Sequence, residues 1–343
     1  MKFYYMRKIR IGVVGVGIQG EAHVMCLKSL HNVELIGIAD VNEKRARYIA
    51  EKYKIPKVYT DYRDLARDKE IEAITVATPD FLHKDPVIVA AENGKHVLVE
   101  KPMATSLRDA EDMANAVRRY DIKFMVNFEN RFNPPFVKVK EDIDKGILGR
   151  PLYAYIRLSD TIYVPTQMIK WSNKTEVCFF LMSHTVDLAR WYFNDSVKTV
   201  FATSRAEVLK GLGIDTPDMY VALLKFKKGG IAFLESCWIL PNSMPSVFDF
   251  KFELICDKGA VFVNTQNESI ERFTEGKWSY PHFMKLYSVH NRTIGFLREA
   301  LGHFISCIAE DQEPLISVKD GLENVRILCK IRESASKGVS LSL

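Results

Sequence analysis

The chain has 343 residues, of which 47% are hydrophobic and 27% are charged. This length and composition are typical of a globular protein with about two domains. Its net charge of +5 is small, and Lys and Arg alternate with Asp and Glu, so we expect a solvated charged surface and no nucleic-acid partner. No apolar run reaches the roughly 18 residues of a membrane-spanning helix, so we expect no membrane partner.

The six cysteines lie far apart, and no Cys-x-x-Cys motif is present. We therefore expect reduced thiols, a cytoplasmic location and no metal site. The basic, aromatic start at residues 1–10 leads into an apolar stretch that glycines interrupt and that is needed as the first strand. We expect no cleaved signal peptide there.

The first part of the chain alternates strand and helix patterns, which predicts a parallel sheet covered by helices. Expected strands cover residues 8–14, 33–39, 73–77, 96–99 and 123–126, and expected helices cover 21–30, 42–54, 81–92 and 106–120.

Farther along, strands follow one another without intervening helices, which favours a largely antiparallel sheet in an α+β domain. Hairpin turns are expected at 227–230 and 257–260. We place a dinucleotide-binding domain at residues 1–126 and a substrate-binding and oligomerisation domain at 127–343. Expected strands cover 152–158, 197–207, 219–225, 230–237, 248–256 and 260–264, and expected helices cover 135–145, 182–191, 293–310 and 319–336.

Residues 15–20, Gly-Val-Gly-Ile-Gln-Gly, lie between an expected strand and an expected helix. Gly15 permits a tight turn, Gly17 lets a pyrophosphate approach the backbone, and Gly20 lets the helix pack close to the strand. The first N–H groups of the helix then face the anion.

Asp40 ends the next strand, where a carboxylate can hold a ribose 2′-hydroxyl. The alternative is a structural glycine turn followed by an acidic helix cap, but the ordered series of elements favours a dinucleotide site. A carboxylate repels a 2′-phosphate, which favours NAD. Because Lys44 and Arg45 are close enough to approach such a phosphate, NADP stays possible.

Ligands of such sheets bind beyond the carboxyl ends of the strands, where Thr78-Pro79 and Glu100-Lys101-Pro102 are expected. Pro102 restricts the backbone of Lys101, and burial lowers the pKa of a lysine toward a range useful for proton transfer. The alternative is a loop lysine paired with a neighbouring acid, and local sequence alone favours it.

His184 lies in an expected amphipathic helix, and Asp187 follows three residues later on the same face. The carboxylate is placed to orient the imidazole or raise its basicity. A lone helical histidine is more often structural, so this pattern alone favours a structural role.

Taken together, these motifs resemble the glucose–fructose oxidoreductase/inositol dehydrogenase/MocA family from Lys8 to the end of the chain. Glu-Lys-Pro directly after the strand expected at 96–99 is the most specific of them. They are the glycine turn with Asp40, Thr78-Pro79-Asp80-Phe81-Leu82-His83, Glu100-Lys101-Pro102, Asn130-Arg131-Phe132 with Pro134, His184-x-x-Asp187 and the closing residues 320–338.

The resemblance implies an N-terminal Rossmann domain, a C-terminal domain with an open mixed sheet, and a nicotinamide cofactor that lies against Glu100 and Lys101. It implies proton transfer by Lys101, action of His184 at the reacting hydroxyl, and a homo-oligomer, dimer or tetramer, that pairs through the open sheets. It further implies cofactor contacts at Gly15, Gly17, Ile18, Gln19, Asp40, Thr78, Pro79, His83, Glu100 and Lys101, and substrate contacts at Lys101, Arg131, Trp171, Phe180 and His184, with Asp187 as the orienting group.

One position departs from the family pattern. The family acid that precedes the catalytic histidine by four residues is replaced by Phe180, and Thr175-Glu176 stands where paired glycines are usual. We expect Phe180 on the helix of His184, next to a more apolar pocket.

The sequence therefore predicts an NAD(P)-dependent oxidoreductase that transfers a hydride between its cofactor and a carbon of a sugar, polyol or related small carbonyl compound. Two alternatives stay open. Phe180 motivates the first, a nicotinamide-binding regulator or sensor without sugar turnover, and the second is an enzyme that uses the cofactor transiently for elimination or epimerisation.

Overall fold

The computed structural model describes residues 7–343. The expectation that the start of the chain is not a cleaved signal peptide falls partly on residues 1–6, which lie outside the described residues. Contacts divide the chain into two compact units. Unit 1 contains the described residues up to Phe132 together with Met284–Leu322, and unit 2 contains Asn133–Phe283 together with Glu323–Leu343. The prediction from sequence had a single boundary after residue 126 and left 284–322 in the second domain. The apolar pattern of a helix does not reveal which core receives it.

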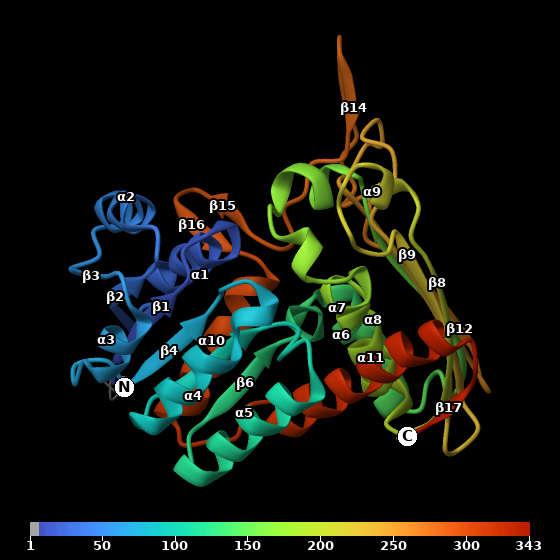
Figure 1. Ribbon diagram of the computed structural model, residues 1–343, viewed down its shortest axis with the longest axis horizontal. Helices are drawn as coiled ribbons and strands as arrows, with labels where there is room; N and C mark the ends of the chain where they lie inside the picture. Colours follow the sequence, from blue (N-terminus) through green and yellow to red (C-terminus); the bar gives the residue numbers. More distant parts are fainter. Residues whose placement is uncertain (1–6) are drawn as a thin grey trace. The chain divides into compact units, whose positions relative to one another are not determined.

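Unit 1 is built on a six-stranded parallel sheet with the order β3-β2-β1-β4-β5-β6 (Figure 1). Apart from the edge strand β3, its strands are short, mainly apolar runs that are largely buried in the core, as expected when helices cover both faces. The strands are β1 Ile9–Val14, β2 Val33–Ala39, β3 Lys57–Tyr59, β4 Ala73–Val76, β5 His96–Glu100 and β6 Phe124–Asn127.

Three helices of unit 1, α2, α3 and α5, begin where a side chain satisfies a free backbone N–H group. Asn42 caps α2 by accepting from the Arg45 N–H at 3.1 Å, and Ser106 caps α5 by accepting from the Asp109 N–H at 3.1 Å. The helices are α1 Ile18–Ser29, α2 Glu43–Tyr53, α3 Tyr62–Arg67, α4 Lys84–Glu92, α5 Leu107–Tyr120 and α10 Phe296–Ala309, with short 3-10 turns η1 Asp80–Leu82 and η2 Glu129–Phe132 and a hairpin β15 Tyr287–Val289, β16 Arg292–Ile294.

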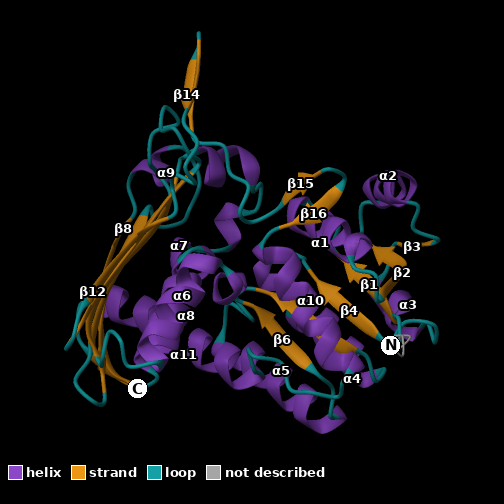
Figure 2. Cartoon of the chain, turned by 180° about the vertical axis from the view of Figure 1, so that it is seen from behind, coloured by secondary structure: helices purple, strands orange, loops and turns teal. Residues whose placement is uncertain are grey.

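Unit 2 contains a seven-stranded mixed sheet with the order β12-β11-β7-β10-β9-β8-β17 (Figure 2). Within this sheet, as far as the described residues form it, only the β7–β10 pair is parallel, so the sheet is largely antiparallel, as predicted. The strands are β7 Pro151–Asp160, β8 Val197–Arg205, β9 Met219–Phe226, β10 Ile231–Cys237, β11 Phe248–Cys256, β12 Ala260–Asn264 and β17 Leu341–Ser342, with a separate hairpin β13 Arg272–Thr274, β14 Lys277–Ser279.

Helices cover one face of the unit 2 sheet, and their apolar side chains form one core with the inward residues of its strands. Within that core, Tyr192 packs against Phe252 with ring centroids 4.9 Å apart and donates a hydrogen bond to the Phe136 carbonyl at 2.9 Å. The helical segments are α6 Pro134–Asp144, η3 Val164–Met168, η4 Ser172–Lys174, α7 Val177–Phe180, α8 Met182–Phe193, α9 Val208–Gly211 and α11 Val318–Lys337, whose first residues lie in unit 1.

The predicted fold class, a doubly wound parallel sheet followed by an α+β domain with a mixed sheet, is confirmed. The sequence pattern missed β3, α3, α9, β17 and the two small hairpins, because these elements are too short to show a hydrophobic period. Within the described residues, no helix is both long enough and apolar enough to cross a membrane.

Candidate functional site

The turn from β1 into α1 uses two of its glycines for packing. Gly15 has φ +82°, and a Cβ atom there would lie 2.8 Å from the Ala77 carbonyl oxygen. A Cβ atom on Gly20 would overlap the carbonyl oxygen of Gly15. Both positions therefore require glycine for the turn itself, whether or not a ligand binds.

Gly17 is different, because a Cβ atom there would meet no atom of the described chain within 4 Å. Gly17 is also the N-cap of α1, and no side chain caps the helix. The first N–H groups of α1 thus face open space, and Ile18 beside them is 68% exposed. Free N–H donors at an uncovered helix N-terminus fit the pyrophosphate of a dinucleotide.

Asp40 is held at the adjacent strand end. Its carboxylate accepts hydrogen bonds from the N–H groups of Val16 and Asn42, both at 2.8 Å. Arg45 donates to the Val16 carbonyl at 2.9 Å and to the Glu21 carboxylate at 2.5 Å. The acid is therefore fixed beside the glycine turn, and the Arg45 guanidinium, one of the two cations considered for a 2′-phosphate, is bound to Glu21.

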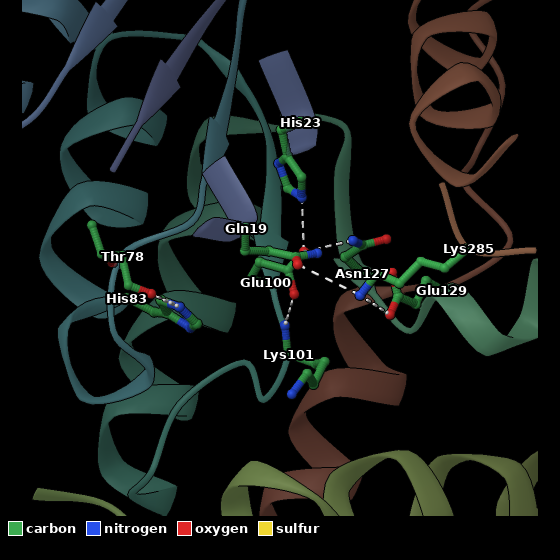
Figure 3. Close-up of polar contacts among 9 residues, drawn as sticks. All are labelled: Gln19, His23, Thr78, His83, Glu100, Lys101, Asn127, Glu129 and Lys285. Carbon is green, nitrogen blue, oxygen red and sulfur yellow. Dashed lines mark hydrogen bonds and ion pairs between the residues drawn. The ribbon is translucent and has the colours of Figure 1, made fainter. Parts of the chain in front are cut away.

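Glu100, the last residue of β5, is the centre of a buried polar network (Figure 3). Its Oε1 atom accepts hydrogen bonds from three side chains that come from two other elements. Gln19 and His23 of α1 reach it at 3.0 and 2.8 Å, and Asn127 of β6 reaches it at 2.7 Å. Burial opposes ionisation, but these bonds, His23 foremost, hold the pKa of Glu100 well below its usual range.

Lys101 follows directly. Its backbone N–H donates to Glu100 Oε2 at 3.3 Å, and the Lys101–Pro102 peptide bond is cis. Partial burial lowers the pKa of Lys101, Glu100 opposes that effect, and the neighbouring Lys285 adds to it. The ammonium of Lys101 therefore releases its proton more readily than an ordinary lysine.

His83 is buried, and both ring nitrogens face backbone carbonyl groups. Nδ1 lies 2.8 Å from the Pro102 oxygen, and Nε2 lies 3.0 Å from the Thr78 oxygen. The imidazole thus joins the loop after β4, which contains Thr78 and Pro79, to the loop that carries Lys101. Burial lowers the pKa of His83.

Arg131 is also buried in unit 1. Its Nη2 atom lies 3.4 Å from the carboxylate of Asp320, at the start of α11. The structure therefore links two motifs that are far apart in the sequence, Asn130-Arg131-Phe132 and the closing segment.

Four residues of the network were not predicted: His23, Asn127, Glu129 and Lys285. Asn127 could have been predicted from the sequence, because it is a polar residue at the carboxyl end of an apolar strand. Lys285 could not, because no sequence pattern relates it to Glu129, which it contacts at 2.7 Å although the two residues are far apart in the sequence.

In unit 2, α8 places His184 and Asp187 three residues apart on a largely buried helix. The expectation that Phe180 shares this helix was wrong. Phe180 is the last residue of α7, and α8 begins at Met182 after a break at Leu181. The spacing of four residues therefore does not by itself place Phe180 on the same helix face as His184.

Phe180 lies in an aromatic group. Its ring centroid is 6.0 Å from that of Trp171 and 6.0 Å from that of Trp238. Trp238 is fully buried and donates its indole N–H to the Pro217 carbonyl at 2.8 Å. The position where the family pattern has an acid is thus surrounded by apolar rings.

Glu176, a nearby carboxylate, is committed to other groups. It accepts a hydrogen bond from the Tyr220 hydroxyl at 2.5 Å and lies 3.7 Å from Arg332 Nη1. Burial, the adjacent Cys178 and this carboxylate raise the pKa of Tyr220. These contacts argue against Glu176 as a substitute for the missing acid.

Comparison with known families agrees with this geometry. The model of the oxidoreductase family with an NAD-binding Rossmann fold matches residues 9–128, and the model of its C-terminal alpha/beta domain matches residues 140–343. The chain belongs to the glucose–fructose oxidoreductase/inositol dehydrogenase/MocA family. Residues 9–128 are its NAD-binding domain.

Similar proteins match nearly the whole chain. Myo-inositol 2-dehydrogenase of Thermotoga maritima is 28% identical over 91% of this chain and 92% of its own. The scyllo-inositol 2-dehydrogenase (NAD(+)) of Bacillus subtilis is 25% identical over 98% of this chain and 96% of its own. The crystal structure of a probable dehydrogenase from Thermotoga maritima has a TM-score of 0.83 and 26% identity, covering 97% of this chain and 98% of that one.

The two glycines of the turn provide a paired test. The free energy of unfolding of Gly17→Ala should lie within about 1 kcal/mol of the wild-type value, because the new Cβ atom meets no protein atom. The same variant should bind NAD more weakly. Gly20→Ala should destabilise the fold by about 1–3 kcal/mol through overpacking against Gly15. Thermal unfolding and NAD titration separate the two effects. Wild-type NAD affinity in Gly17→Ala would contradict the placement of the pyrophosphate.

Proposed function

We propose that this oxidoreductase uses NAD to oxidise or reduce a carbon of a sugar, polyol or related small carbonyl compound. The observation that carries the proposal is the Glu100–Lys101 pair at the carboxyl end of β5, bonded through Gln19 to the NAD-binding glycine turn. The names of its relatives, inositol dehydrogenases among them, support this class of substrate.

When bound, NAD supplies the hydride chemistry. The protein binds and orients the reactants and moves a proton at the substrate oxygen. We assign that proton transfer to Lys101, whose lowered pKa suits a base, and to His184, with Asp187 as its orienting group.

The other residues are assigned by their position around the glycine turn and the Glu100–Lys101 pair. Glycine-turn residues and Asp40 would hold the pyrophosphate and ribose, and the Thr78-Pro79 loop would border the cofactor. His83 would act through the loops it joins, since its ring nitrogens face carbonyl groups. We keep Arg131, Trp171 and Phe180 as proposed substrate-binding residues.

Replacing Lys101 tests the function directly. Lys101→Met should lower turnover about 100-fold or more, because a positioned acid–base group is lost, while NAD affinity changes only a few-fold. The wild type should oxidise its substrate faster as pH rises, with an apparent pKa below that of an ordinary lysine, because the neutral amine accepts the proton. Wild-type turnover in Lys101→Met would remove Lys101 from the mechanism.

Asp40 should make the site prefer NAD. Asp40→Ala should weaken NAD binding and reduce discrimination against NADP, because both the charge and the ribose contact are lost. Asp40→Asn is the matched control, since it keeps the shape and a hydrogen-bonding oxygen but removes the charge. Titration with both cofactors measures the effect. Tighter binding of NADP than of NAD by the wild type would contradict the assignment.

Phe180 should restrict the substrate. An apolar ring leaves a buried substrate hydroxyl unpaired at a cost of about 1–3 kcal/mol, so inositol should be a poor substrate. Phe180→Asp should raise kcat/KM on inositol, whereas Phe180→Leu, which stays apolar, should not. Efficient oxidation of free inositol by the wild type would refute this role. An absence of NAD turnover over a broad sugar and polyol panel would favour the regulatory or transient-cofactor alternatives.

We further propose that the chain forms a homo-oligomer through the uncovered face of the unit 2 sheet. Cross-strand pairs place Phe201 beside Leu223, Leu223 beside Phe233, and Phe233 beside Tyr155 in one row. Phe201 and Leu223 are exposed, although a row of large apolar side chains is more favourable when it is buried.

We also propose a cytoplasmic location, which is supported by six free cysteines, four of them buried.

A further inference from the structure

Lys285 enters the cofactor-binding unit from a segment whose sequence contains no recognisable site motif. It lies just before the β15–β16 hairpin, and the two ends of that hairpin segment meet at the start of α10. The Phe296 N–H donates to the Met284 carbonyl at 2.9 Å, and the Leu297 N–H donates to the Lys285 carbonyl at 3.2 Å. The backbone of Lys285 is therefore fixed to the N-terminus of a long helix.

Gly295 supports the same closure. Its φ is +124°, and a Cβ atom there would overlap the carbonyl oxygen of Lys285. Helix α10 packs against α1 and η2, and the hairpin packs against α1 as well. These contacts bring Lys285 to the side of the glycine turn.

The Lys285 ammonium contacts two parts of the site (Figure 3). It lies 2.7 Å from Glu129 Oε1 and 3.5 Å from the amide oxygen of Gln19. The amide nitrogen of the same Gln19 side chain donates to Glu100 at 3.0 Å. Lys285 thus lies at one end of a chain of polar contacts that reaches the backbone of Lys101 through Glu100.

Charge explains why a cation is needed at this place. Glu129 and Glu100 are both buried, and Glu129 Oε2 has no hydrogen-bond partner among the described residues. A buried carboxylate without compensation is strongly unfavourable, so each requires donors or a cation. Burial disfavours the charged form of Lys285, but Glu129 and Glu100 together raise its pKa, so it stays protonated.

We propose that Lys285 is a positioning residue of the NAD site, which holds Gln19 and Glu129 so that the glycine turn, Glu100 and the Lys101 backbone keep one arrangement. The inference rests on the proposed function only where it concerns Lys101. The expected effect of Lys285 on NAD binding depends only on Gln19 and the glycine turn.

A second consequence concerns the proton on Lys101. Among the charged groups that act on Lys101, Glu100, Glu129 and Asp80 favour its protonated form, and Lys285 disfavours it. Removing the Lys285 charge removes an influence that favours the neutral amine. The pKa of Lys101 should then rise, and the neutral amine should form only at higher pH.

The test compares Lys285→Met with Lys285→Arg, and uses Lys69→Met as the matched control. Lys69 is an exposed lysine of unit 1, so its loss changes the net charge equally without touching the network. NAD affinity, measured by fluorescence titration without substrate, should fall on the order of tenfold in Lys285→Met and recover to within about threefold in Lys285→Arg. The acid limb of the turnover profile should move to higher pH in Lys285→Met.

Unchanged NAD affinity in Lys285→Met would overturn the proposal, and so would equal losses in Lys285→Met and Lys69→Met. If Lys285→Met does not fold, the double variant Glu129→Gln with Lys285→Met removes the unpaired buried carboxylate. It should fold and still bind NAD weakly, and wild-type affinity in it would overturn the role of Lys285 toward Gln19. If Lys101→Met keeps wild-type turnover, the proposed mechanism fails, while these NAD titrations still decide the role of Lys285.

Discussion

The burial of the Glu100 carboxylate is the constraint on which the rest of the cofactor-binding unit depends. A charged group at the end of a central parallel strand has little water around it, so the protein must supply its hydrogen bonds. Gln19, His23 and Asn127 all donate to one of its oxygens, and the Lys101 N–H donates to the other. One carboxylate therefore ties the first helix, the last strand and the lysine loop to each other.

Short covalent and polar connections join the glycine turn to the loop of Lys101. Gln19 lies two residues after Gly17, the N-cap of α1, where a Cβ atom would meet no other atom of the described chain. Its side chain contacts Glu100, which in turn accepts from the Lys101 N–H. His83 makes a second connection between loops, from Thr78 to Pro102. The unit is organised so that the loops of three strands share a few buried polar groups.

Unit 2 is organised differently, because one face of its sheet packs in a core and the other face has no helices on it. Aliphatic and aromatic side chains together fill the covered side, and Phe180 contacts the rings of Trp171 and Trp238. A phenylalanine here packs against apolar rings and introduces no charge beside them. The change is compatible with the fold, so its effect should appear in substrate choice.

The sequence by itself determined the order of the longer strands and helices, the Rossmann turn and the family, because local periodicity and short motifs encode these features. Tertiary structure alone decided three others. It assigned 284–322 to unit 1, brought Lys285 and Glu129 together, and separated Phe180 from the helix of His184 at Leu181. The physical reason is that long-range ion pairs and helix breaks depend on which surfaces meet in the fold, and the spacing of residues along the chain does not indicate which surfaces meet.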